Sequence, residues 1–146
     1  MTLTRADDAE ALFRSGFSCS QAVSLAFAED FGIDRKTALK FSCAFGGGMA
    51  HSGNTCGVVT GALMVIGMKY GRARVDDLPA KDKTYAVTKA FMTEFLRCNH
   101  SLNCTELVGY NLSDPAHLAI AKEKGLFKTR CPALVRDAAE ILENVL

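Results

Sequence analysis

The sequence predicts an all-α protein, a compact single domain of about seven or eight helices that spans residues 1–146. Apolar residues recur at the spacing of a helix face along most of the chain. Capping residues and glycines mark where several of these segments begin and end. No segment shows the alternation of apolar β-branched and polar residues that is typical of a strand. A chain of 146 residues that is 49% hydrophobic and 23% charged is long enough to bury its own core.

The first three helices are predicted from their capping signals. One runs from about Thr4 to Arg14, with acidic residues in its first turn. The second begins at Ser18, where Ser18-Cys19-Ser20-Gln21 has the form of a capping box, and Gly32 ends it. Asp34 caps the third helix. We expect its apolar stripe to consist of four residues, which are Ala38, Leu39, Phe41 and Phe45.

A glycine-rich stretch, residues 46–54, cannot be regular helix and separates these helices from the rest of the chain. Five further helices follow it. Asp76 or Asp77 with Pro79 starts the second of these five, and Asp114 with Pro115 starts the fourth. The last begins around Cys131 and Pro132 and continues to the end of the chain. The expected ranges are about 55–70, 77–97, 103–109, 114–125 and 131–146.

Composition limits the partners and the location that we expect. The formal net charge is +1, so the chain lacks the basic field that attracts nucleic acid or an acidic membrane. The longest apolar stretch, Val58 to Met68, is too short to span a bilayer, and residues 1–8 turn acidic where a secretory signal turns apolar. We therefore expect a cytoplasmic protein with no nucleic-acid partner and no membrane insertion. A redox partner, a small molecule and a homo-oligomer all stay open.

The chain has six cysteines, which in a reducing compartment indicate catalysis, redox sensing or metal binding more than a structural disulfide framework. Four of them fall within the predicted first turn of a helix, where unpaired backbone N–H groups favour a thiolate. These four are Cys19, Cys56, Cys104 and Cys131. Cys43 and Cys98 lie near predicted helix ends instead, and we expect both to be small buried hydrophobic residues.

Cys56 has the most unusual neighbourhood of the six. A glycine-rich loop precedes it, and its free amides could form an anion pocket beside the thiol. Gly57 and Gly61 follow at a spacing that lets two helices approach closely, and we favour that packing role for both glycines. His51, five residues before Cys56, could tune the thiolate or bind a metal, although a loop histidine without a function is the favoured interpretation.

At these residues the sequence resembles a family of redox-active bacterial and archaeal proteins that is named C_GCAxxG_C_C after its cysteine pattern. The matching segments are Gly16–Ala22, Phe45–Met49, Cys56–Ala62, Leu102–Cys104 and Cys131. The resemblance implies that the family's four characteristic cysteines map onto the four selected above, and it implies a redox role. Val58 stands where the family motif usually has alanine, which adds bulk beside Cys56. Cys43 and Cys98 are additional to the pattern.

Two hypotheses follow for the four cysteines. In the first, Cys56 is the nucleophilic or electron-accepting thiol of a thiol-dependent redox protein, and Cys19, Cys104 or Cys131 resolves it as a disulfide without a cofactor. In the alternative, the same four thiolates hold zinc or an iron–sulfur cluster. We favour the first, because the dispersed cysteines lack the short chelating pair that most such metal sites use. The absence of a Cys-x-x-Cys motif argues against a thioredoxin-type dithiol, a zinc ribbon and covalent c-type haem.

Both hypotheses require the helices that carry the four cysteines to direct them at one region of the fold. We expect Cys56 at the centre of that region, because its glycine loop provides access and conformational freedom. We also expect Cys56 to be alkylated fastest, whereas Cys43 and Cys98 should react slowly.

Overall fold

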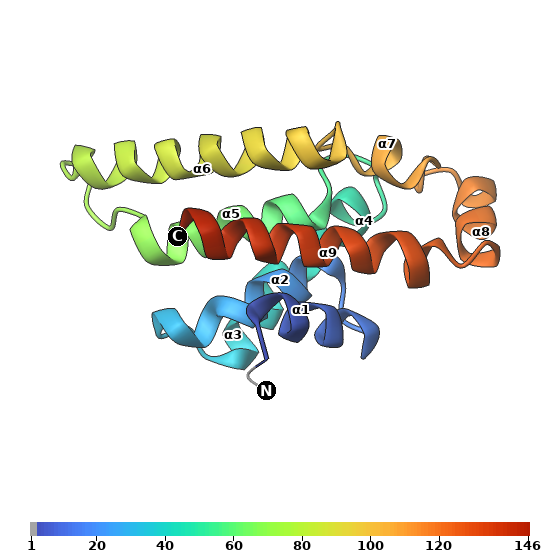
Figure 1. Cartoon of the computed structure of the whole chain (residues 1–146), viewed down its shortest axis with the longest axis horizontal. Helices are drawn as coiled ribbons and strands as arrows, with labels where there is room; N and C mark the ends of the chain where they lie inside the picture. Colours follow the sequence, from blue (N-terminus) through green and yellow to red (C-terminus); the bar gives the residue numbers. More distant parts are fainter. Residues whose placement is uncertain (1–2) are drawn as a thin grey trace.

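The computed structural model describes residues 3–146 and is all-α, as the sequence predicts (Figure 1). Two short 3₁₀ segments, Glu29–Phe31 and Cys43–Phe45, extend α2 and α3. Over the described residues there is no strand beyond one isolated bridge that pairs Thr55 with Asn103. The helices are α1 (Arg5–Arg14), α2 (Cys19–Ala28), α3 (Arg35–Ser42), α4 (Gly46–Met49), α5 (Gly57–Tyr70), α6 (Leu78–Asn99), α7 (Cys104–Val108), α8 (Pro115–Glu123) and α9 (Leu126–Val145).

The helix starts follow the capping residues that the sequence shows. Thr4 and Ser18 each form a complete capping box, with Asp7 and Gln21 respectively, so two backbone donors are satisfied at each start. The side chains of four further residues accept a backbone N–H at helix starts. These are Asp34 on α3, Asp77 on α6, Asn103 on α7 and Asp114 on α8.

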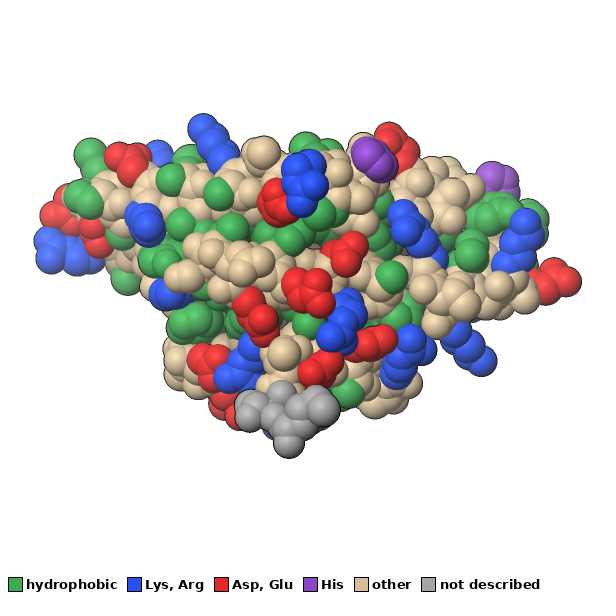
Figure 2. Space-filling model, in the orientation of Figure 1, with side chains coloured by type: hydrophobic (Ala, Val, Ile, Leu, Met, Phe, Trp, Pro, Cys, Tyr) green, Lys and Arg blue, Asp and Glu red, His purple; other side chains and the backbone are tan. Residues whose placement is uncertain are grey.

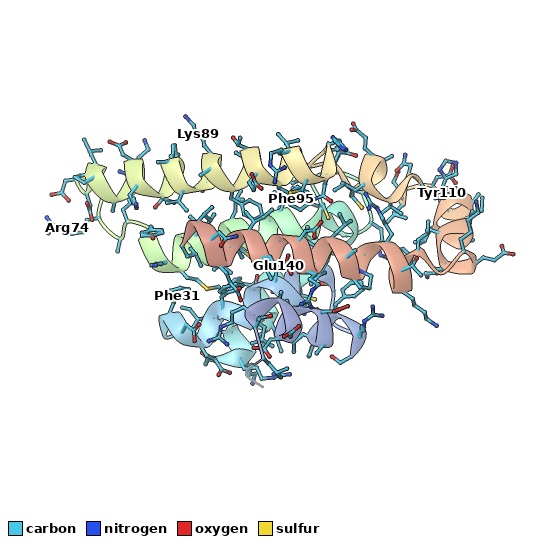
Figure 3. The ribbon with its side chains drawn as sticks, in the orientation of Figure 1. Phe31, Arg74, Lys89, Phe95, Tyr110 and Glu140 are labelled. Atoms are coloured by element: carbon cyan, nitrogen blue, oxygen red, sulfur yellow. The ribbon has the colours of Figure 1, made fainter. Side chains whose placement is uncertain are left out.

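The core lies where α2, α5, α6 and α9 meet. Figure 1 shows α6 and α9 running side by side along the molecule, with α1, α2 and α3 beneath them. Phe91 and Phe95 of α6 are fully buried and stack with ring centroids 5.9 Å apart. Figure 3 shows Phe95 directed into this core, whereas Lys89 of the same helix points away from it. Burial of these aromatic side chains is the main stabilising contribution of α6.

The close contact between α2 and α5 depends on small residues. A Cβ atom at Gly61 would lie 2.9 Å from the carbonyl oxygen of Ser20, so only glycine allows the two backbones to approach this closely. Ser20 and Ser24 on the facing side of α2 are themselves fully buried. The helix-packing interpretation of this glycine is therefore confirmed.

The predicted apolar stripe of α3 is partly wrong. Ala38 is buried against α2, but Phe41 is 41% exposed, and Leu39 and Phe45 are only partly covered. α3 lies at the edge of the molecule and packs mainly against α2, so nothing covers the side of the helix on which Phe41 lies (Figure 1).

The last helix begins earlier than the sequence predicts. α9 starts at Leu126, so Pro132 lies inside it and Cys131 lies in its second turn. A proline lacks the N–H that would bond the carbonyl four residues earlier. That carbonyl belongs to Lys128, and the Arg14 guanidinium donates to it instead, at 3.3 Å. A donor from α1 thus replaces the missing backbone donor, and the helix continues through the proline.

Basic and acidic side chains are interspersed over the face of the molecule that Figure 2 shows. Two ion pairs tie α9 to α1, since Arg136 contacts Asp7 at 2.8 Å and Glu10 at 3.2 Å. Among residues 3–146, no helix combines the length and the apolar character that crossing a bilayer requires.

Candidate functional site

A cavity of about 410 Å³ lies where α2, α5, α7 and α9 meet, and cysteines are its most unusual feature. The four cysteines selected from the sequence all line it, each from a different helix: Cys19, Cys56, Cys104 and Cys131. Cys43 also borders it, which the sequence did not indicate. All five thiols, and that of Cys98, are free.

Cys19 is the first residue of α2, directly after the Ser18 cap, and is half-buried. Its pKa falls from the ordinary 9.0 to about 7. The largest cause is a hydrogen bond from the Cys56 thiol; burial opposes it, and the backbone N–H groups of Gly47, Ser20 and Cys19 itself lower the pKa further. Cys19 is therefore substantially ionised at neutral pH.

Cys56 is the N-cap of α5 and is only 5% exposed. Its pKa is raised well above 9.0, first by the hydrogen bond with Cys19 and then by burial and by the negative charge of Cys19. One backbone N–H, that of Val58, acts in the opposite direction. Because Cys19 receives three backbone donors and Cys56 one, the single negative charge of the pair belongs on Cys19. The expectation that the start of α5 lowers the pKa of Cys56 is wrong.

Gly57 leaves room for the Cys19 sulfur at the start of α5. A Cβ atom at Gly57 would collide with the Cys19 sulfur and would lie 3.1 Å from the carbonyl oxygen of Phe45. The glycine-rich stretch contributes as well. Gly47 of α4 has a left-handed φ of +68°, so α4 is not regular helix there, and its N–H lowers the pKa of Cys19. The one amide of this stretch that lowers a thiol pKa therefore acts on Cys19, and not on Cys56 as the sequence suggested.

Cys104 and Cys131 belong to a second hydrophobic cluster with Val108, Leu112 and Ala121. Burial, and then the negative charge of Cys19, raise the pKa of Cys104 to about 11. The pKa of Cys131 is raised to about 12, mainly by burial. The predicted lowering is wrong for both thiols. α7 is only five residues long, so burial outweighs its small dipole, and Cys131 lies beyond the first turn of α9.

Cys43 and Cys98 are both exposed, so their predicted role as buried hydrophobic residues is wrong. Cys43 begins the 3₁₀ segment that follows α3, at the border of the cavity. Cys98 lies on the outer side of α6, where its sulfur is 3.7 Å from a Glu94 carboxylate oxygen and 3.6 Å from an Arg97 nitrogen. Both positions end helices at the edge of the bundle, where no other element covers them.

Two loops that are far apart in the sequence pair with each other and bring Cys56 and Cys104 into the same region. The Cys56 N–H donates to the carbonyl of Leu102 at 2.8 Å, and the Cys104 N–H donates to that of Asn54 at 2.6 Å. These bonds flank the isolated bridge between Thr55 and Asn103. The pairing involves only three residues on each side, too few to leave a strand pattern in the sequence.

The rest of the cavity wall is uncharged and largely apolar. Of the described residues that line it, none is a lysine, arginine, aspartate or glutamate, and His51 is the only titratable one besides the cysteines. The apolar lining residues are Phe13, Val58, Val108, Leu112, Phe127 and Leu134. Within the described part of the chain, no group of three or more His, Cys, Asp or Glu side chains is placed to hold a metal ion.

Comparison with known proteins adds one match. The family model described as "Putative redox-active protein (C_GCAxxG_C_C)" matches residues 17–145, nearly the whole chain. No curated protein and no solved structure matches significantly. The match includes every element that carries a cysteine of the cavity.

Proposed function

The chain belongs to the C_GCAxxG_C_C family, and from this premise we propose that it is a thiol–disulfide redox protein in which Cys19 is the nucleophile and Cys56 the resolving thiol. The observation that carries the proposal is the placement of both thiols on one cavity, where the Cys19 sulfur lies against Gly57, the residue after Cys56. The lowered pKa of Cys19 and the raised pKa of Cys56 put the negative charge on Cys19. A thiolate is the reactive form of cysteine, and a neighbouring thiol in contact with it is positioned to complete a disulfide. The proposal thus exchanges the roles that the sequence suggested for these two cysteines.

The reaction would oxidise the pair by two electrons. The Cys19 thiolate attacks an electrophilic atom of a two-electron oxidant and forms a covalent adduct, while the first leaving group departs. The Cys56 thiol then loses its proton and attacks the Cys19 sulfur, which releases the second half of the oxidant as its leaving group. The product is a Cys19–Cys56 disulfide, and an external dithiol would reduce it again.

Cys104 and Cys131 have a different role in the proposal. Both thiols are protonated at neutral pH because burial raises their pKa, so neither competes with Cys19 for the oxidant. They line the same cavity, and we assign them as a second dithiol that exchanges with the first pair after its oxidation. We place the protein in the cytoplasm, where cellular reductants return both pairs to the thiol form.

The test is to map the disulfides after one equivalent of oxidant. Mass spectrometry of the wild type should find a Cys19–Cys56 disulfide as the first product, and Cys56→Ser should accumulate an adduct on Cys19 instead. Cys98→Ser is the matched control, because Cys98 lies outside the cavity, and it should behave as the wild type does. A first disulfide that lacks Cys19 would refute the proposal.

The metal alternative is tested on the same sample. Protein purified without oxygen should contain less than a stoichiometric amount of zinc or iron and should show no visible absorption band of an iron–sulfur cluster. Stoichiometric metal that is lost together with Cys19, Cys56, Cys104 or Cys131 would establish the alternative.

A further inference from the structure

The cavity beside Cys19 limits which oxidant can reach the thiolate, and this inference rests on the function proposed for the Cys19–Cys56 pair. We propose that the substrate is a small, uncharged organic hydroperoxide. Three features of the cavity carry the proposal: its size, its uncharged wall, and the thiol proton that lies next to the thiolate.

The first feature is the size of the cavity. A volume of about 410 Å³ lies in the range of small-molecule sites, which hold most of a ligand's surface out of water. Cys56 is 5% exposed and Cys104 4% exposed, so their sulfurs lie at the inner end of this space. A disulfide on the surface of a folded protein could not reach both members of the Cys19–Cys56 pair.

The second feature is charge. An ion that enters the cavity loses hydration and finds no lysine, arginine, aspartate or glutamate on the wall in exchange. The Cys19 thiolate also repels anions, which disfavours disulfides that carry carboxylates, such as glutathione disulfide. The side chains of Phe13, Val108 and Phe127 would instead contact an apolar organic group.

The third feature is the proton on Cys56. A hydroperoxide that is attacked by a thiolate releases an alkoxide, a strong base that needs a proton immediately. The Cys56 thiol lines the same cavity, directly before the Gly57 that the Cys19 sulfur lies against, and can provide the proton. An organic disulfide would instead release a thiolate anion into a cavity that has no charged group to stabilise it. The site thus favours oxygen–oxygen over sulfur–sulfur cleavage.

The reaction balances with these groups alone. The Cys19 thiolate attacks the terminal oxygen, an S–O bond forms and the O–O bond breaks, and the alkoxide takes the Cys56 proton and leaves as an alcohol. This step yields a sulfenic acid on Cys19 and a thiolate on Cys56. The Cys56 thiolate then attacks the Cys19 sulfur, the disulfide forms, and hydroxide leaves and takes a proton from solvent to become water.

The test compares the rate of Cys19–Cys56 disulfide formation with three oxidants: cumene hydroperoxide, bis(2-hydroxyethyl) disulfide and glutathione disulfide. Each rate is divided by the rate at which the same oxidant reacts with the thiolate of 2-mercaptoethanol. This division cancels the differences in intrinsic reactivity among the three oxidants. After this correction, the rate with cumene hydroperoxide should exceed the rate with either disulfide by about tenfold or more. Of the three oxidants, only cumene hydroperoxide is uncharged and also releases an alkoxide that takes the Cys56 proton. Equal corrected rates, or a preference for either disulfide, would overturn the proposal.

A variant at the cavity mouth tests the charge argument without disturbing the core. Ala50 is exposed and lines the cavity, so Ala50→Lys adds a cation there. It should raise the ratio of the rate with glutathione disulfide to the rate with cumene hydroperoxide about threefold to fivefold, because the added cation attracts only the charged oxidant. Ala90→Lys, at an exposed position of α6 away from the cavity, is the matched control and should change neither rate.

The outcomes separate this inference from the proposed function. If a Cys19–Cys56 disulfide forms but the corrected rates favour a disulfide oxidant, the substrate class is wrong and the redox pair stands. If Ala50→Lys leaves the ratio of the rate with glutathione disulfide to the rate with cumene hydroperoxide unchanged, the charge argument is wrong. If no oxidant produces that disulfide, the proposed function fails and the inference fails with it.

Discussion

At the scale of single residues, hydrogen-bond donors decide which thiol carries the negative charge. Cys19 and Cys56 both stand at a helix start, so the macrodipole alone does not distinguish them. The difference is that three backbone N–H groups point at Cys19 and one points at Cys56. One of the three comes from Gly47, which adopts a positive φ in a loop that is distant from Cys19 in sequence. Sequence position therefore predicted the lowered pKa of Cys19 but not the raised pKa of Cys56.

Gly57 provides a test at this scale. Gly57→Ala places a methyl group against the Cys19 sulfur and should cost about 1–3 kcal/mol of unfolding free energy, because α2 and α5 must separate. It should also slow formation of the Cys19–Cys56 disulfide. Denaturant unfolding of the reduced protein measures the first effect and disulfide mapping the second.

Gly67→Ala is the matched control on the same helix. No atom lies within 4 Å of a Cβ placed at Gly67, and alanine favours the helix over glycine by about 1 kcal/mol. Gly67→Ala should therefore stabilise the fold or leave it unchanged. Equal stability of the two variants would show that Gly57 is not the contact that brings α2 and α5 together.

At the scale of elements, the structure differs from the prediction mainly at α9. Proline is common in the first turn of a helix, so Pro132 predicts that the last helix starts near residue 131. The helix begins at Leu126, and Arg14 of α1 donates to the Lys128 carbonyl that Pro132 leaves without a backbone donor. Such a tertiary donor leaves no signal in the local sequence, whereas the caps of α2 and α3 are local and were predicted correctly.

Because Arg14 donates to the carbonyl that Pro132 leaves free, substitutions at these two positions should not have additive effects on the free energy of unfolding. Arg14→Ala should destabilise the wild type by about 0.5–1 kcal/mol through loss of the bond to Lys128. In a Pro132→Ala background the same change should cost less, because the substituted alanine would supply a backbone N–H to that carbonyl. A double-mutant cycle measured by urea unfolding gives the difference. Additive effects would show that Arg14 does not replace the missing donor.

At the scale of the whole molecule, the fold gathers thiols from four helices on one cavity and keeps three of them protonated. The helical class and most helix starts follow from periodicity and caps, which are local properties. The convergence of Cys56 and Cys104 depends on the paired loops around Thr55 and Asn103, and the distribution of the thiols over two hydrophobic clusters depends on how the helices pack. Neither feature could be predicted from spacing, because both arise from contacts between distant segments.

Protonated buried thiols predict how stability depends on pH. A thiol whose pKa is raised by folding ionises first in the unfolded chain, so the fold loses stability as the pH rises above 9.0 towards the folded value. Cys19 has the opposite sign, since its lowered pKa adds stability between about pH 7 and pH 9. The unfolding free energy of the reduced protein should therefore rise from pH 7 to pH 9 and fall above it.

Cys104→Ala isolates one contribution to this profile. The loss of packing lowers the unfolding free energy by the same amount at every pH. The decline of the unfolding free energy between pH 9 and pH 11 should become shallower, since the pKa of Cys104 is about 11. Cys98→Ala should keep the slope of the wild type, because that thiol is exposed. An unchanged slope in Cys104→Ala would indicate that Cys104 is already ionised or is solvated in the folded state.

The most direct measurement is the alkylation rate of each cysteine as a function of pH, resolved by mass spectrometry on the reduced protein. We predict that Cys19 reacts with a midpoint near pH 7, and that Cys56, Cys104 and Cys131 stay unreactive until well above pH 9. Cys56→Ala should raise the midpoint of Cys19 by about one to two pH units, because a hydrogen bond to a charged group contributes about 1.5–3 kcal/mol. A midpoint near pH 7 at Cys56 with Cys19 still protonated, or no thiol that ionises below pH 8, would contradict the assignment of Cys19 as the nucleophile.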